Sequence, residues 1–145
     1  MQHERRRLLI TGASGDVGRP LSALASHSWR TLSTFYSNAA VGGGQPIRLD
    51  LRDRAEALAA ATRFRPDVII HAAASDRSQD MAATNRGAAR SILAVAQAAG
   101  ARLIALSADM VFDGAQPPYS EDAPRAPLTE YGAVKAENER GPCSN

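Results

Sequence analysis

The sequence has very little cysteine: Cys143 is the single cysteine among 145 residues. One cysteine cannot form a disulfide within the chain or a cysteine-based metal site, so we predict no disulfide framework and no metal ligands. A chain without disulfides is typical of a reducing compartment, and we therefore expect a cytoplasmic protein.

Long apolar runs and a strong excess of one charge are also missing. No run approaches the roughly 20 residues that a membrane-spanning helix needs, and no apolar signal core follows Arg5–Arg7. The net charge is +2, and both signs are mixed outside that solvated arginine cluster. We expect a soluble protein whose partners are neither a membrane nor a nucleic acid.

What the chain does have is a glycine pattern near its start. The apolar run Leu8–Ile10 stops at a turn, Gly12 to Gly18, in which glycines recur every third residue before a helical segment. Such a turn brings bare backbone N–H groups close to an anion, although ordinary loops also place three glycines near a strand end. We interpret it as a cradle for a dinucleotide diphosphate, formed by Gly12, Ser14, Gly15, Asp16, Val17 and Gly18.

The rest of the chain alternates between strand and helix patterns. With 44% hydrophobic residues it can bury one core, and it predicts an α/β, Rossmann-type doubly wound parallel sheet. About five strands are expected in the order 3-2-1-4-5, truncated after the fifth, which would be an exposed apolar edge open to a second copy or a partner. The expected strands are 8–11, 31–36, 46–49, 67–71 and 101–106, and the expected helices are 17–26, 54–63, 80–99 and a last one carrying Tyr131; Val17, Leu21, Leu24 and Ala25 are the expected packing face of the first helix.

The residues after the second predicted strand bear on the choice of cofactor. In nicotinamide enzymes an acid at this point holds the adenosine ribose hydroxyls. Tyr36, Ser37 and Asn38 include no carboxylate to repel a phosphorylated ribose, and no arginine to pair with one. The turn slightly favours NADP over NAD, and the choice stays open.

Other strand ends supply further candidates. Asp53 is expected to cap the helix that follows it, and His71 to be a satisfied core histidine. Ala72–Ala74 are small enough to let a ribose and a nicotinamide lie against the backbone, although three alanines also suit plain packing. Ser107 follows the strand 101–106, at the sheet edge where ligands collect.

Tyr131 and Lys135 are four residues apart, which places both side chains on one face of a helix. A phenol can donate a proton to a carbonyl oxygen or take one back, and a neighbouring ammonium group favours the ionised phenol. We therefore choose Tyr131, Lys135 and Ser107 as catalytic candidates.

These motifs together carry a family resemblance. Thr11–Gly18 resembles the extended short-chain dehydrogenase/reductase superfamily of NAD-dependent epimerases and dehydratases. Ser107–Gly114, Pro118–Asp122 and Pro127–Lys135 closely resemble its dTDP-4-dehydrorhamnose reductase branch. The resemblance extends to about Glu139 and implies NAD(P)-dependent reduction of a 4-keto nucleotide-sugar, with Tyr131 as the acid and Lys135 as its partner.

The resemblance also implies binding roles. Asp50 would accept a hydrogen bond from the adenine amino group while the backbone of Leu51 meets the ring. Ala72, Ala73 and Ala74 would line the nicotinamide end, and Lys135 would hold its ribose. Asn85 matches an asparagine that the family usually carries, although a polar residue on a helix is otherwise most often exposed.

Two departures from the family keep a second function open. Ala108 replaces a serine or threonine that bonds the substrate carbonyl, and on a strand the neighbouring Ser107 points to the other face. We interpret 1–140 as an incomplete NAD(P)-binding domain and 141–145 as a tail, with the C-terminal substrate domain absent. The alternative function is a non-catalytic NAD(P)-binding module, because the same branch includes the regulatory subunit of methionine adenosyltransferase.

Overall fold

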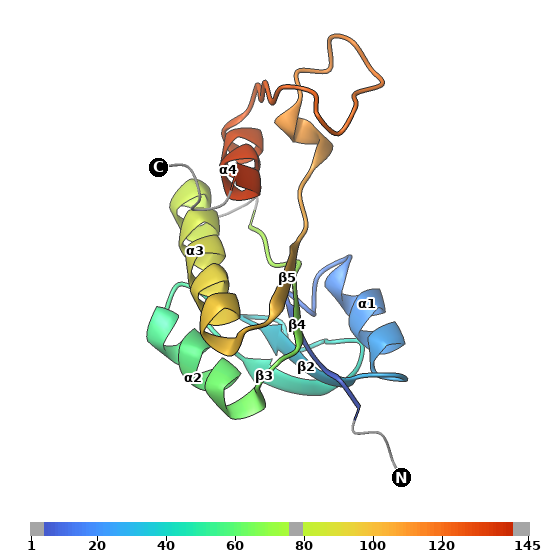
Figure 1. The fold of residues 1–145 in the computed structure, drawn as a ribbon, viewed down its shortest axis with the longest axis vertical. Helices are drawn as coiled ribbons and strands as arrows, with labels where there is room; N and C mark the ends of the chain where they lie inside the picture. The colour runs from blue at the N-terminus through green and yellow to red at the C-terminus, as the bar shows by residue number, and fades with distance from the viewer. Residues whose placement is uncertain (1–4, 76–79, 141–145) are drawn as a thin grey trace. The chain divides into compact units, whose positions relative to one another are not determined.

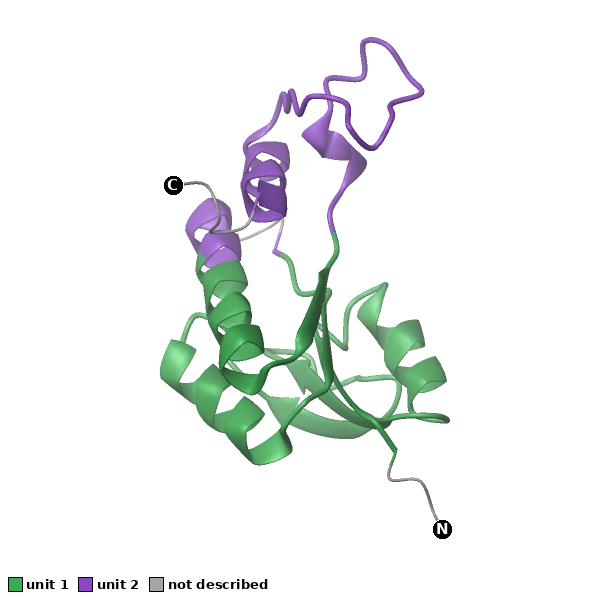
Figure 2. Ribbon diagram, in the orientation of Figure 1, with its two compact units in different colours: residues 1–74, 87–106 green, residues 75–86, 107–145 purple. Residues whose placement is uncertain are grey.

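The computed structural model describes residues 5–75 and 80–140. The predicted tail 141–145, with Cys143, lies outside the described residues. The chain divides into two compact units, shown in different colours in Figure 2: unit 1 comprises residues 1–74 and 87–106, and unit 2 comprises residues 75–86 and 107–145. Each unit is described by itself below.

Unit 1 is built on a five-stranded parallel sheet in the order β3-β2-β1-β4-β5 (Figure 1). Central strand β1 pairs with β2 on one side and β4 on the other, so that Leu9 lies between Leu32 and Ile69. The strands are β1 (Arg7–Thr11), β2 (Arg30–Phe35), β3 (Gln45–Arg48), β4 (Val68–His71) and β5 (Arg102–Ala105). The predicted Rossmann-type sheet and its strand order are confirmed.

One face of the sheet carries the larger core. Helix α2 (Arg54–Phe64) and the unit 1 part of α3 (Met81–Ala99) cover it (Figure 1). The side chain of Asp53 accepts a hydrogen bond from the backbone N–H of Glu56 at 3.0 Å, which confirms the expected helix cap. The buried residues of this core are Leu9, Leu32, Leu49, Leu51, Ala57, Ala61, Phe64, Ile69, Ala88, Ile92, Val95 and Ala96.

Helix α1 (Gly18–Ala25), on the other face, packs differently from expectation. Leu21 and Ala25 contact the core as predicted, but Val17 is 56% exposed and Leu24 73% exposed. The buried residues of α1 are Gly18 and Ser22, and the Ser22 hydroxyl accepts a hydrogen bond from the backbone N–H of Gly42. Gly18 and Ser22 let this face of the helix approach the glycine turn and the Gly42 loop closely, and Leu24 is left on the exposed side.

Strand β5 lies at the edge of the sheet. Within the described residues it pairs with β4 alone, and Ile104 is 41% exposed. The expected exposed edge is therefore confirmed for the described residues, because no second strand lies beside β5 there.

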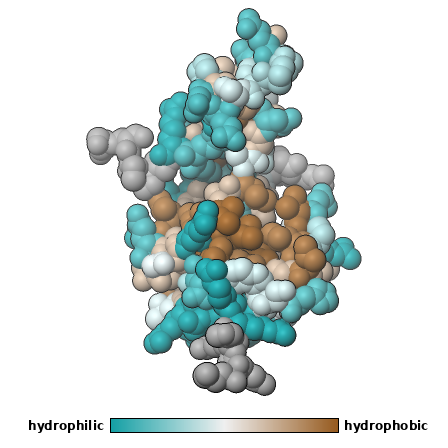
Figure 3. All heavy atoms as spheres, turned by 45° about the vertical axis from the view of Figure 1, so that its right-hand side comes forward, coloured by the Kyte–Doolittle hydropathy of each residue, from teal (hydrophilic) through white to brown (hydrophobic). Residues whose placement is uncertain are grey.

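Hydrophobic surface gathers in the middle of the view in Figure 3. Among the described residues of unit 1, the large hydrophobic residues that are exposed are Val17, Leu24, Tyr36 and Ile104. None of the helices among the described residues has the length and hydropathy of a membrane span.

Unit 2 contains the first residues of α3, the short 3-10 helix η1 (Asp109–Val111) and α4 (Glu130–Arg140). The rings of Phe112 and Tyr119 stack at a centroid distance of 4.4 Å, and the Arg125 guanidinium lies 5.3 Å from the Phe112 ring centroid. A side chain at Gly132 would collide with the Met110 carbonyl oxygen, so α4 packs directly on η1.

Candidate functional site

The turn after β1 needs glycine at its first and last positions because of the chain's own packing. Gly12 has a φ of +68°, a left-handed conformation that costs other residues about 1–2 kcal/mol. A Cβ added there would lie 2.6 Å from the Ala73 Cα, and one added at Gly18 would collide with the Gly12 carbonyl oxygen. The turn is therefore pressed against the end of β4.

Gly15, the middle glycine, has no such requirement. It is exposed and outside the left-handed region, and a Cβ added to it would meet only the Gly12 oxygen, at 3.4 Å. The fold itself thus tolerates a side chain at this position. The N-cap residue of α1, Val17, provides no side-chain hydrogen bond to the first turn. The free space at Gly15, beside a helix start that has no side-chain cap, fits a bound diphosphate. Ser14, Asp16 and Val17 lie in the same turn.

A buried polar pair holds this turn to β4. The Thr11 Oγ1 and His71 Nδ1 atoms are 2.7 Å apart, and neither residue is more than 6% exposed. Thr11 also accepts hydrogen bonds from the backbone N–H groups of Ala72 and Ala73. His71 is thus a satisfied core histidine, while Ala72 and Ala73 are half-buried and Ala74 is exposed at the end of β4.

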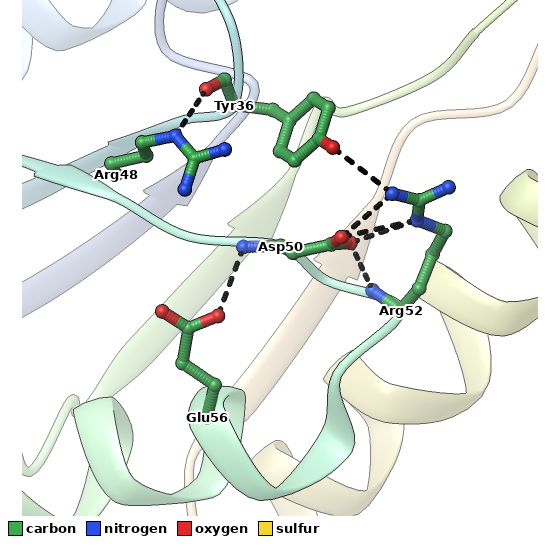
Figure 4. Close-up of polar contacts among 5 residues, drawn as sticks. All are labelled: Tyr36, Arg48, Asp50, Arg52 and Glu56. Atoms are coloured by element: carbon green, nitrogen blue, oxygen red, sulfur yellow. Dashed lines mark hydrogen bonds and ion pairs between the residues drawn. The ribbon is translucent and has the colours of Figure 1, made fainter.

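A polar cluster lies at the ends of β2 and β3 (Figure 4). Arg52 forms an ion pair with Asp50 at 2.7 Å and donates a hydrogen bond to the Tyr36 hydroxyl at 3.1 Å. The Arg48 Nε donates to the Tyr36 carbonyl oxygen at 3.1 Å. The Tyr36–Asn38 turn itself has no arginine, but pairing of β2 with β3 places Arg48 opposite Phe35. Sequence reasoning missed this cluster because its members come from two separate strands.

Asp50, the predicted adenine contact, is already engaged in this cluster. Both of its carboxylate oxygens accept hydrogen bonds from Arg52, which hold the pKa of Asp50 below its usual range. Its backbone N–H donates to Glu56, and Leu51 is buried in the core. A carboxylate oxygen can accept more than one hydrogen bond, so the adenine role of Asp50 stays a prediction.

In unit 2, α4 brings Tyr131 and Lys135 together. The Lys135 Nζ lies 5.6 Å from the centroid of the Tyr131 ring. Lys135 is 8% exposed, and this burial lowers its pKa. The pair therefore combines a phenol with an amine that releases its proton more readily than a solvated lysine.

Ser107, the third catalytic candidate, donates a hydrogen bond to Glu139 on α4. Glu139 also accepts from Arg125 Nε at 2.6 Å. Burial raises the pKa of Glu139. The hydrogen bonds from Ser107 and Arg125, together with the charge of Arg125, outweigh that effect, so the pKa of Glu139 is lowered overall. The Ser107 hydroxyl thus joins a structural network, and its catalytic role stays a prediction.

Asn85 is buried rather than exposed, which corrects the ordinary expectation for a polar residue on a helix. Its side-chain oxygen accepts from the Ser75 N–H, and its amide nitrogen donates to the Ser75 oxygen, both at 2.8 Å. The amide therefore fixes the backbone that follows Ala74. Its predicted contact with a cofactor is not tested by this arrangement.

The parallel sheet, with a glycine turn after β1, defines an NAD(P)-binding Rossmann-type fold of the reductase kind. Residues 6–141 match the family described as RmlD substrate binding domain, and the chain belongs to that family.

The chain is also similar to relatives that carry different names. The chain is 41% identical to methionine adenosyltransferase 2 subunit beta of Xenopus laevis over 97% of its length and 43% of the relative. It is 35% identical to dTDP-4-dehydrorhamnose reductase of Streptomyces griseus over 95% of its length and 45% of the relative. The crystal structure of the Bordetella bronchiseptica enzyme WbmG with NAD and UDP has a TM-score of 0.78 at 28% identity, covering 92% of this chain and 48% of that one. The chain thus spans about half the length of these proteins.

Proposed function

We propose that this chain is the cofactor-binding and proton-donating part of an NAD(P)-dependent reductase that acts on the keto group of a 4-keto nucleotide-sugar. The observation that carries the proposal is the pairing of buried Lys135 with Tyr131 on α4. A chance tyrosine and lysine on a solvated helix would have no reason to bury the amine. The similarity to dTDP-4-dehydrorhamnose reductase supports the choice of substrate class.

Each unit carries part of the proposed set of cofactor contacts. The open position at Gly15 supports a diphosphate at the glycine turn, and the relative whose structure holds NAD supports this class of cofactor. The proposed contacts are Gly12, Ser14, Gly15, Asp16, Val17 and Gly18 for the diphosphate, Asp50 and Leu51 for the adenine, and Ala72, Ala73, Ala74, Asn85, Tyr131 and Lys135 for the nicotinamide end.

When bound, NAD(P)H supplies the hydride that reduces the carbonyl carbon. The Tyr131 phenol then donates its proton to the carbonyl oxygen, leaving a phenolate. The ammonium group of Lys135 stabilises that phenolate and, because its pKa is lowered by burial, can return a proton to it.

The first test separates chemistry from binding. Tyr131→Phe removes only the phenolic hydroxyl, so we expect NADPH oxidation with dTDP-4-dehydrorhamnose to fall by about a hundredfold or more while NADPH binding is unchanged. Tyr119→Phe is the matched control and should keep its turnover. Equal turnover by the Tyr131→Phe protein and the parent would exclude this mechanism.

The second test concerns the cradle. Gly15→Val should abolish NADPH binding, measured by fluorescence titration, because the side chain fills space that a diphosphate needs. Its unfolding curve should match that of the parent, since the chain leaves that space open. Binding at the parent's affinity would remove the cradle from the proposal.

A second candidate function is a non-catalytic NAD(P)-binding module that joins a methionine adenosyltransferase. Ala108 supports it, because it lacks the hydroxyl that a reductase would aim at the substrate carbonyl, and so does the 41% identity to a subunit beta. Ala108→Ser distinguishes the two functions. A reductase should gain turnover from the added hydroxyl, whereas a binding module should show no turnover in either form and co-purify in a fixed ratio with a methionine adenosyltransferase catalytic subunit.

A further inference from the structure

Two arginines converge on one exposed tyrosine at the carboxyl edge of the unit 1 sheet. The guanidinium carbons of Arg48 and Arg52 lie 5.1 Å and 5.4 Å from the Tyr36 ring centroid, and the two groups flank the ring in Figure 4. Tyr36 is 49% exposed. The contacts hold both cations beside the residue that follows β2.

The two arginines differ in how their charge is balanced. Arg52 is paired with Asp50, which accepts hydrogen bonds from it through both carboxylate oxygens. Arg48 donates to a backbone carbonyl oxygen and lies over the ring, and among the described residues no carboxylate lies within ion-pair distance of it. The charge of Arg48 acts on Asp50 only at longer range than an ion pair, so among the described residues Arg48 is the cation of this cluster that is more available to an added anion.

The position of the cluster indicates which anion Arg48 would bind. In dinucleotide-binding sheets the adenosine ribose lies at the end of the second strand, where a carboxylate accepts from a free 2′-hydroxyl or an arginine accommodates a 2′-phosphate. Here the residues after β2 provide no carboxylate, and the nearby acid, Asp50, is already bonded to Arg52. A dianionic phosphate would find guanidinium donors, which bind phosphate in a fixed fork geometry.

We propose that Arg48, with Arg52 and Tyr36 fixing the geometry, recognises the 2′-phosphate of NADP(H) and makes this chain selective for the phosphorylated cofactor. This inference rests on the proposed binding of a dinucleotide and adds the residue that determines its identity. Asp50 holds Arg52 in place, and the Tyr36 ring holds the Arg48 guanidinium at the sheet edge.

The test is a pair of fluorescence titrations, with NADPH and with NADH, on the parent and on Arg48→Gln. We expect the parent to bind NADPH at least about tenfold more tightly than NADH, and Arg48→Gln to lose that preference through weaker NADPH binding with NADH affinity unchanged. Arg54→Gln, an exposed arginine at the start of α2, is the matched control and should keep the preference. Far-ultraviolet circular dichroism of each variant verifies that the fold is intact.

The outcomes distinguish the role of Arg48 from dinucleotide binding itself. Equal affinity of the parent for both cofactors, or equal losses for both in Arg48→Gln, would overturn the role of Arg48 while leaving dinucleotide binding in place. A parent that binds neither cofactor would overturn dinucleotide binding and the recognition site together. Raised salt should weaken NADPH binding more than NADH binding, because the phosphate contact is ionic and exposed.

Discussion

The glycine turn of unit 1 and the second half of helix α4 in unit 2 are held in place by different kinds of contact. The turn depends on backbone packed against backbone, with Gly12 pressed on Ala73. The first half of α4 also packs by its backbone, through Gly132 on the Met110 carbonyl oxygen. Its second half is held by long side chains: Glu137 pairs with Arg86, and Glu139 with Arg125, each at 2.6 Å. Backbone atoms in steric contact leave no room for an added side chain, whereas ion pairs near the surface contribute only about 0–1 kcal/mol each to stability. Substitution of Gly12 should therefore be more severe than substitution of a residue in these two ion pairs.

The largest effect is expected at Gly12. Gly12→Val combines a left-handed φ with a side chain directed at the Ala73 backbone, and it should destabilise the protein by about 3 kcal/mol. Urea unfolding followed by circular dichroism measures the loss. Gly87→Ala is the matched control: this glycine lies within α3 with open space around it, so alanine should stabilise the protein by roughly 0.5–1 kcal/mol. An unchanged midpoint for Gly12→Val would mean that the turn can rearrange.

An intermediate effect is expected at Asn85, whose buried side chain forms two hydrogen bonds with the Ser75 backbone. Asn85→Ala leaves the Ser75 N–H and carbonyl without their partner, which should cost about 1–2 kcal/mol in the same unfolding measurement. Asn138→Ala, on α4, removes an amide that makes no such hydrogen bond within the described part of the chain, and it should change stability by less than about 0.5 kcal/mol. Equal losses in the two variants would contradict the anchoring role of Asn85.

The smallest effect is expected from the Glu139 network, and it should depend on pH. The pKa of Glu139 is lowered in the folded protein, so its contribution is present above the ordinary value of 4.5 and is lost as the pH falls through the folded value. Glu139→Gln should therefore reduce the thermal midpoint near neutral pH, by an amount equivalent to about 1 kcal/mol or less, and have no effect in strong acid. A difference that persisted in strong acid would show that packing, rather than charge, holds this contact.

Features that depend on local spacing could be predicted from the sequence. The run of apolar residues before Gly12 predicted β1, and the spacing of Tyr131 and Lys135 predicted their meeting on one helix face. The face of α1 could not be predicted in full, because periodicity identifies Leu24 as apolar but does not show that Gly18 and Ser22 permit the closest approach.

Contacts between distant segments were outside the reach of sequence reasoning. Arg48 contacts Tyr36 because the register of β2 with β3 places them side by side, and no residue of the Tyr36–Asn38 turn predicts that contact. Ser107 and Arg125 meet at Glu139 through exposed hydrogen bonds, which leave no periodic pattern in the chain.

The packing of Gly12 on Ala73 has a consequence for the order in which the protein forms during synthesis. Strands β1, β2 and β3 leave the ribosome first and can pair with one another, but β4 binds to the opposite side of β1 and is made later. Pairing of such distant segments is slow, because the intervening chain must close a large loop. The nascent chain therefore contains the complete glycine turn for some time before β4 is made and Ala73 can pack against Gly12.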